Sequence, residues 1–306
     1  MNAPSQNPAA PLLAATFVTA LWGLSFVSTK TLLGHIAPIQ VAFLRHLLAT
    51  CSIWLAVAFA RPPLRVHESD LPRMVAASLI GIPVYFYFEN TALLYIPAAL
   101  ASIVTASSPA MTAIIQSRVR KRGLSPAGWA GILLSAAGVA FVVTGDATQA
   151  LQNANYFRGI SMVLISSLAW AVYTVLNGPL VRKYGALATN AHQISLATAV
   201  LAIMAIPGGM PGVSVIARPQ VAFNLAYLGI ACSFLAYVLY LFALRRLGPT
   251  LVSVFINLVP VFGVAGSAVI LGERLTGAQL LGGAGVVVGI FVVERSQRKA
   301  GPRCTS

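Results

Sequence analysis

Two opposite charges interrupt apolar segments of the sequence and are its strongest candidates for chemistry. Arg45 lies seven residues into the apolar segment 38–60, and Glu89 lies six residues before the end of the segment 73–95. Charged side chains inside apolar segments are costly and usually have a function or a partner. At 1.5 Å per residue of helix, both would lie about 10 Å below the same membrane surface. We therefore expect an ion pair or a shared polar cavity, with Arg45 facing a substrate carboxylate and Glu89 as its partner or a proton site.

The alternative for Arg45 and Glu89 is a structural pair that fastens two helices together. Other side chains in neighbouring apolar segments favour a cavity. Trp22 and Trp170 lie near the middle of their segments in the two halves of the chain, Tyr85 lies in the segment of Glu89, and Asn257 lies about seven residues into the segment 250–271. Aromatic side chains suit an amphipathic or cationic substrate, although a single one more often packs between helices.

Two prolines occupy matching positions in the two halves, Pro109 and Pro260. A proline inside an apolar helix leaves a backbone carbonyl group unpaired, which is tolerated where the helix lines a cavity. We expect these two residues to act as gate or hinge elements, and the alternative is a pair of tolerated kinks. Lys30 is expected to reach the lipid headgroups, and Glu273 is expected to be solvated in a loop.

The composition assigns the whole chain to the membrane. Of its 306 residues, 58% are hydrophobic and 8% are charged, whereas soluble domains contain about 25% charged residues. Lipid must therefore be the solvent for most of the chain. The net charge of +14 comes from short basic clusters between apolar segments, which is typical of cytoplasmic loops and argues against a nucleic-acid partner.

The hydropathy pattern predicts an all-α integral membrane protein with ten transmembrane helices, because about 20 apolar residues cross a bilayer. The junction at Ile96-Pro97 is the least distinct boundary, but a single helix there would overrun the membrane. The expected helices are 12–33, 38–60, 73–95, 98–117, 127–144, 159–181, 188–207, 222–244, 250–271 and 277–293.

The distribution of lysine and arginine predicts the orientation. With ten crossings, 15 of these residues fall on one side and three on the other, and Lys30 and Arg45 lie within helices. Basic loops stay in the cytoplasm, so both termini are expected there. The bias also supports the number of crossings, because one missed helix would disturb the alternation.

The two halves resemble each other when the chain is shifted by 151 residues, which aligns Pro109 with Pro260, Gly131 with Gly282 and Gly138 with Gly289. Because five is odd, the second half must enter the membrane inverted, and equivalent loops are basic only where they would face the cytoplasm. Inverted repeats are typical of transporters that bind substrate near the midplane. We expect one repeat at 12–145, an inverted repeat at 156–296 and a basic cytoplasmic tail at 297–306.

At several motifs the chain resembles the EamA-type family of the drug/metabolite transporter superfamily. The motifs are Trp22-Gly23 through Lys30, Phe43-Leu44-Arg45, Asn90 through Tyr95, Ser167 through Ala171, Leu258 through Val261, and Leu271 through Leu275. The resemblance implies a ten-helix carrier of the inner membrane, typically an exporter of amino acids or related metabolites. It also implies that the fifth and tenth helices are peripheral, with their glycines serving helix packing.

The sequence favours transport over other functions. No metalloprotease, hydrolase or phosphate-loop motif is present, so we expect no enzymatic activity, no cofactor and no metal, and gradients must supply the energy. The main hypothesis is a secondary exporter of a small polar or amphipathic metabolite. The alternatives are an importer or exchanger of a vitamin or nucleotide-like anion, and a non-transporting membrane receptor. The oligomeric state stays open, with a homodimer as one alternative.

Overall fold

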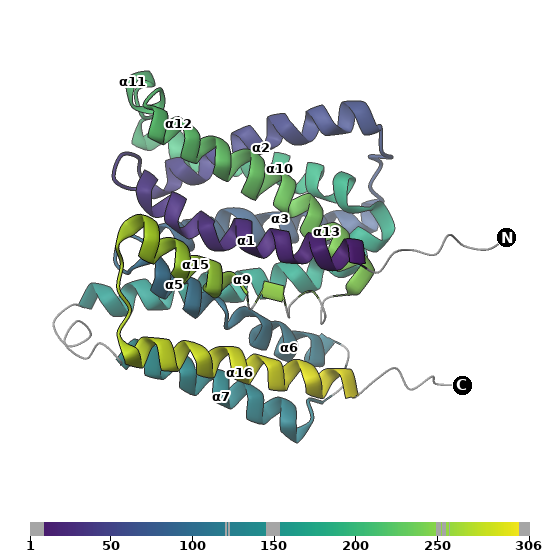
Figure 1. The fold of residues 1–306 in the computed structure, drawn as a ribbon. Coiled ribbons are helices and arrows are strands. Elements are labelled where there is room, and N and C mark those ends of the chain that lie inside the picture. Colours follow the sequence, from purple (N-terminus) through teal and green to yellow (C-terminus); the bar gives the residue numbers. More distant parts are fainter. Residues whose placement is uncertain are drawn as a thin grey trace, which may run out of the picture.

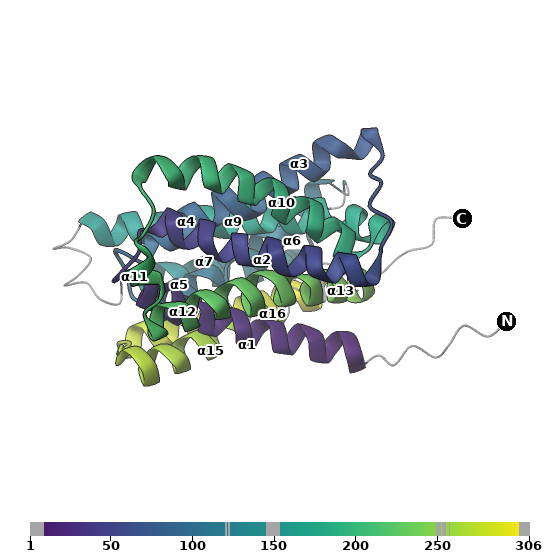
Figure 2. The same ribbon diagram turned by 90° about the horizontal axis from the view of Figure 1, so that it is seen from above.

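The computed structural model describes residues 9–119, 121, 123–144, 154–248, 252, 255–256 and 258–299, and within these ranges every regular element is a helix. The helices lie roughly side by side in one bundle (Figures 1 and 2). Helix α1 begins and α16 ends at the same end of the bundle, which we call the terminal end; the other is the distal end (Figure 1).

The first half contains α1 (Ala9–Leu32), α2 (Pro38–Ala60), η1 (Glu68–Asp70), α3 (Leu71–Leu79), η2 (Ile80–Val84), α4 (Tyr85–Ala92), α5 (Ala98–Thr105), α6 (Ser108–Val119) and α7 (Pro126–Thr144). The second half contains α9 (Ala154–Tyr184), α10 (Ala186–Ala205), η3 (Ile206–Gly208), α11 (Val213–Ile216), α12 (Pro219–Ala226), η4 (Tyr227–Leu235), α13 (Ala236–Leu247), α15 (Val259–Gly266), η5 (Ser267–Leu271) and α16 (Gly277–Lys299).

The membrane character of the bundle is visible in the length of these helices. Among the described residues, seven helices are long and apolar enough to cross a bilayer, and three shorter apolar helices lie at Pro126–Val142, Val259–Leu271 and Gly277–Val293. The shorter helices coincide with the fifth, ninth and tenth predicted crossings. The all-helical membrane fold is confirmed, and the number of ten crossings stays a prediction.

Several of the spans are interrupted near their middle. The segments η2 and η4 are π-helical insertions between α3 and α4 and between α12 and α13, and π-bulges occur frequently at functional sites. Two turn residues, Ala106 and Ser107, separate α5 from α6.

Helices α7 and α16 form a separate pair along one side of the bundle (Figure 1). Their backbones approach so closely that a Cβ atom added to Gly131 would lie 2.5 Å from the carbonyl oxygen of Gly289. Small residues permit this approach between helices in lipid, where packing rather than the hydrophobic effect holds helices together. The expected role of these glycines in helix packing therefore agrees with the structure.

Candidate functional site

A cavity of about 440 Å³ lies between the two halves of the bundle. The first half contributes side chains from α1, α2, α4 and α5, and the second half contributes side chains from α9, α13, the start of α15 and the residues before it. Its walls include Trp22, Ser25, Phe26, Arg45, Tyr85, Phe86, Glu89, Thr105, Trp170, Tyr237, Ile256 and Val259. Five of the six residues predicted from the sequence to line a cavity, Arg45, Glu89, Trp22, Trp170 and Tyr85, are therefore together in one place.

Arg45 is the cation of this cavity and is almost completely buried, with 1% of its surface exposed. Its Nε donates a hydrogen bond of 2.8 Å to Oγ of Ser233 in η4, and its guanidinium carbon lies 4.4 Å from the ring centre of Phe86. Its Nη1 has no hydrogen-bond partner among the residues that the structure describes. A buried guanidinium with an unpaired N–H group is prepared to bind an anionic oxygen.

Glu89 lies on the same cavity but does not neutralise Arg45 directly. Among the described residues the structure contains no ion pair between Arg45 and Glu89. The hydroxyl group of Tyr85, one helical turn earlier, donates a hydrogen bond of 2.5 Å to Oε1 of Glu89. The expected ion pair is therefore wrong, and the shared polar cavity is the alternative that the structure supports.

Aromatic side chains form the remaining wall. The rings of Trp22 and Trp170 meet edge to face with centroids 5.0 Å apart, and Tyr237 lies 5.6 Å from Trp22 and 5.8 Å from Trp170. The indole nitrogen of Trp22 donates a hydrogen bond of 3.0 Å to the carbonyl oxygen of Cys232. This cluster joins α1 to α9 and α13, so the two halves share one aromatic surface.

The two predicted hinge prolines occupy equivalent places in the fold. Each is the second residue of a helix that follows a break, Pro109 in α6 and Pro260 in α15. Proline is well tolerated in a first turn because it needs no intrahelical donor there. The carbonyl oxygen of Thr105, which cannot pair with Pro109, accepts a hydrogen bond of 2.7 Å from Oγ of Ser108. Their role as hinges stays a prediction.

Pro109 also lines a second, smaller cavity of about 190 Å³, which shares Trp170 and Ile256 with the first. Pro260 is buried but does not line either of these cavities. Asn257, the sixth predicted cavity residue, lies outside the described residues.

Sequence reasoning missed Ser233, Tyr237, Thr105 and Ile256. The repeat register contains a signal for two of them. Tyr237 stands 151 residues after Phe86, and Ile256 stands 151 residues after Thr105. Phe86, Thr105, Tyr237 and Ile256 all line the cavity. The same shift that aligns the prolines therefore relates cavity residues of one half to cavity residues of the other.

Two charges near the distal end have partners within the protein that the sequence did not predict. Lys30 is partly buried, and its Nζ donates hydrogen bonds to the carbonyl oxygens of Leu93 and Ile96. Glu273 is not simply solvated, since its two carboxylate oxygens accept hydrogen bonds of 3.0 Å from the backbone N–H groups of Ala98 and Ala99. Both side chains form hydrogen bonds with backbone groups at the helix ends that flank the junction between α4 and α5.

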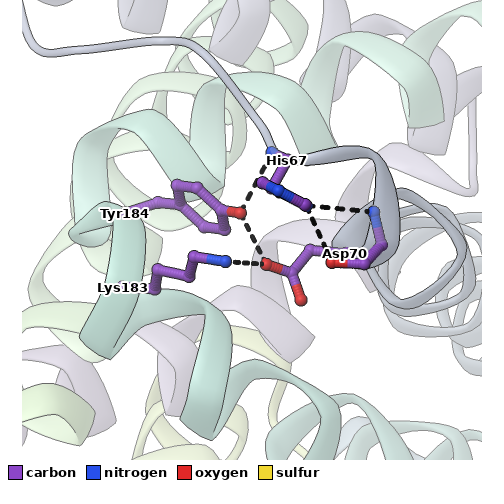
Figure 3. Close-up of polar contacts among 5 residues, drawn as sticks. His67, Asp70, Lys183 and Tyr184 are labelled. Atoms are coloured by element: carbon purple, nitrogen blue, oxygen red, sulfur yellow. Dashed lines mark hydrogen bonds and ion pairs between the residues drawn. The ribbon is translucent and has the colours of Figure 1, made fainter.

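A second polar cluster lies at the terminal end (Figure 3). Asp70 accepts hydrogen bonds of 2.6 Å from Nζ of Lys183 and from the hydroxyl group of Tyr184, while the backbone N–H of His67 donates to the same hydroxyl over 3.1 Å. The segment that connects α2 to α3 is thereby attached to the end of α9. The cluster links the first half to the second, as Glu273 does at the other end.

Comparison with known proteins agrees with this architecture. A model of the EamA-like transporter family matches the chain twice, over residues 10–144 and 157–295. The chain is similar to an uncharacterized transporter of Archaeoglobus fulgidus, with 29% identity over 94% of this chain and 98% of the relative. It is also similar to a probable amino-acid metabolite efflux pump of Salmonella typhimurium, with 27% identity over 94% of this chain and 97% of the relative.

A solved crystal structure has the same fold, with a TM-score of 0.67 and 21% sequence identity. The similarity covers 97% of this chain and all of the solved one. At this level of identity the likeness concerns the fold alone.

Proposed function

Because the chain belongs to the EamA-like transporter family, we propose that it is a secondary transporter that exports amino acids or amino-acid-like metabolites across the inner membrane by alternating access. The family and the relatives are transporters and efflux pumps rather than enzymes. The name of the Salmonella typhimurium relative supports a substrate of the amino-acid type. The chemistry of the cavity supports it independently.

The observation on which this proposal rests is the unpaired Nη1 of the buried Arg45. An unpaired charged donor in a low-dielectric cavity is costly, and a substrate carboxylate removes that cost. The hydroxyl group of Tyr237 is also buried, lines the cavity and has no partner. Arg45 and Tyr237 come from different halves, so one carboxylate that binds both would draw the halves together.

The other polar group of the cavity suits the amino group of such a substrate. Glu89 supplies an anionic oxygen, and the faces of Trp22 and Trp170 attract an ammonium group through cation–π interactions. The surrounding rings also offer apolar surface to a side chain of modest size.

We also propose that the chain crosses the membrane ten times as two inverted repeats. The double match to the family model, at 10–144 and 157–295, supports two related halves, and the cavity between them supports a substrate site at their interface. Structurally equivalent breaks precede Pro109 and Pro260. Rocking of one half against the other around a fixed site is the motion that inverted repeats commonly provide.

The proposed orientation places the terminal end in the cytoplasm. The basic residues Arg61, Lys121, Lys183 and Arg245 lie in segments at this end, and basic loops remain on the cytoplasmic side. Substrate would enter the cavity from the terminal end and leave through the distal end. Because the sequence lacks a phosphate-binding loop, an ion or substrate gradient would supply the energy.

A counterflow assay in proteoliposomes tests the proposal. Vesicles containing the purified protein are loaded with an unlabelled amino acid, and uptake of the labelled amino acid is followed for a panel with apolar, aromatic, acidic and basic side chains. We expect counterflow for zwitterions with apolar or aromatic side chains. At substrate concentrations near the KM of the unmodified protein, we expect strongly reduced counterflow for vesicles containing the Arg45→Gln variant. Preference for a vitamin or nucleotide-like anion would support an exchanger instead, and specific binding without flux would support a receptor.

A further inference from the structure

The contacts of Glu273 connect the two halves at the distal end of the bundle. Its carboxylate lies on the N-terminus of α5, where it accepts the backbone N–H groups of Ala98 and Ala99 at 3.0 Å and a hydrogen bond from the hydroxyl group of Ser267. A negative charge at a helix N-terminus is favoured by the helix dipole and by the unpaired N–H groups there. The carboxylate of Glu273, in the second half, therefore binds the backbone of α5 in the first half.

The position of α5 makes this contact relevant to the cavity. Thr105, the last residue of α5, lines the cavity, and Ser102 of α5 packs so closely against α15 that a Cβ added to Gly263 would lie 2.5 Å from its Oγ. Movement of α5 away from α15 would expose the cavity toward the distal end. Glu273 opposes that movement, because it binds α5 directly from the loop after η5.

Lys30 stabilises the same junction from the opposite side. Its Nζ binds the carbonyl oxygens of Leu93 and Ile96, at the C-terminal end of α4, where a positive charge is favoured. The partly buried ammonium belongs to α1 and remains within the first half. Lys30 therefore fixes the chain that leads into α5, whereas Glu273 forms the contact between halves.

The contacts of Asp70 connect the halves at the terminal end. Its carboxylate binds Lys183 and Tyr184 at the end of α9, each at 2.6 Å (Figure 3). The side chain of Lys183 is 53% exposed and that of Asp70 is 16% exposed. Water and salt weaken an ion pair whose cation is exposed, and among the described residues Asp70 accepts two hydrogen bonds whereas Glu273 accepts three. We therefore expect the Asp70 contact to be the weaker one.

We propose that Glu273 and Asp70 are the two latches of alternating access, each of which must release its partner before its own side of the transporter opens. This inference rests on the proposed alternating access. In the structure the contacts of both latches are formed. Glu273 closes the distal, outward side and Asp70 closes the terminal, cytoplasmic side.

The unequal strength of the latches has a consequence for direction. The weaker, exposed contact at Asp70 releases more readily than the contact of Glu273 with the α5 N-terminus. The resting transporter therefore opens to the cytoplasm more often than to the outside. That bias lets substrate load from the cytoplasm, as an exporter requires.

Accessibility of a cysteine in the cavity tests the latches without any need for a known substrate. Ser25 lines the cavity, and Ser25→Cys is introduced after the native cysteines Cys51, Cys232 and Cys304 are replaced by alanine. A membrane-impermeant maleimide is then applied to right-side-out and inside-out vesicles, and labelling rates are measured on each side.

We expect the two latch variants to shift labelling in opposite directions. Glu273→Gln should raise the labelling rate from outside about tenfold and lower it from inside, in line with the loss of charge-assisted hydrogen bonds. Asp70→Asn should raise the rate from inside by about threefold, because exposed pairs contribute less. Ser267→Ala and Tyr184→Phe each remove one donor from a latch, and they should produce smaller shifts in the same directions.

Neighbouring exposed charges supply matched controls. Arg274→Gln changes the charge next to Glu273, and Glu68→Gln changes the charge in the same turn as Asp70; both side chains are exposed. Neither control should alter labelling on either side. The double variant Asp70→Lys with Lys183→Asp should restore much of the inward rate of the unmodified protein, since it restores an ion pair.

The result separates the latches from the transport function. Unchanged labelling in Glu273→Gln and Ser267→Ala, with both proteins folded by size-exclusion chromatography, would overturn the latch at the distal end. The same outcome for Asp70→Asn and Tyr184→Phe would overturn the terminal latch. Opposite shifts support the latches even if the counterflow panel finds no flux, whereas flux with unshifted labelling supports transport alone.

Discussion

Arg45 of α2 donates a hydrogen bond of 2.8 Å through Nε to Oγ of Ser233, a residue of the π-helical segment η4 in the other half of the chain. This contact leaves Nη1 unpaired at the cavity. The first half supplies the guanidinium group of Arg45, and the second half orients it through Ser233. Movement between the halves would therefore change the position of a charge that lines the cavity.

Substitution of Arg45 should therefore affect substrate affinity more than folding. Arg45→Gln should raise the KM by about 10- to 100-fold, as expected for the loss of a charged hydrogen bond of about 1.5–3 kcal/mol. Ser233→Ala should raise it by a smaller factor, because the charge remains but is less well oriented. Initial rates of counterflow measure both. Unchanged KM with lower protein yield in Arg45→Gln would make this residue structural.

The hydroxyl group of Tyr237 offers a more selective test. Tyr237→Phe should raise the KM by about three- to tenfold, because a neutral hydrogen bond to substrate is worth about 0.5–1.5 kcal/mol. The fold should be unaffected, since this hydroxyl has no hydrogen-bond partner in the described part of the chain.

Tyr173→Phe is the matched control for Tyr237→Phe. The hydroxyl group of Tyr173 is also buried and unpaired, but Tyr173 does not line the cavity. Its substitution should leave the KM unchanged. Equal effects of the two substitutions on KM would contradict a direct contact between Tyr237 and substrate.

Glu89 should make transport depend on pH. The proposed substrate ammonium binds the ionised carboxylate, so acidification that protonates Glu89 should raise the KM of the unmodified protein. Glu89→Gln should raise the KM at neutral pH and remove this dependence on pH. Rates of counterflow at a series of equal internal and external pH values measure it. A pH profile that Glu89→Gln leaves intact would assign the dependence to another group.

The α7–α16 pair should matter for stability and not for substrate recognition. Gly131→Ala places a Cβ 2.5 Å from the carbonyl oxygen of Gly289, and overpacking of this kind costs about 1–3 kcal/mol. Thermal unfolding in detergent should show a lower midpoint, while the KM of the folded protein is unchanged. Gly123→Ala is the control, because nothing lies within 4 Å of a Cβ there.

The apolar segments and their rare charges were enough to predict much of the cavity. Arg45 and Glu89 were identified because a charged side chain inside an apolar segment is costly and usually has a function or a partner. In the structure both side chains line the same cavity. The choice between an ion pair and a shared cavity could not be predicted in this way, because the position of a residue along a helix fixes its depth in the membrane and not the direction of its side chain. Tyr237 gave no such signal on its own, and only its spacing from Phe86 relates it to the site.

The charges near the distal end show a second limit. Lys30 and Glu273 were expected at the surface because each is close to the end of an apolar segment. The junction at Ile96-Pro97 ends one helix and begins another, and helix ends leave several N–H and C=O groups unpaired. Those groups are the partners of the two charges. Which distant side chains meet them depends on tertiary packing that local sequence does not contain.

Counterflow of a labelled amino acid in proteoliposomes tests the central claim most directly. We predict saturable exchange of a zwitterion with an apolar or aromatic side chain. At substrate concentrations near the KM of the unmodified protein, that exchange should be strongly reduced in vesicles that contain equal amounts of folded Arg45→Gln protein. Exchange that proceeds equally well in Arg45→Gln, or the absence of exchange for every amino acid in the panel, would contradict it.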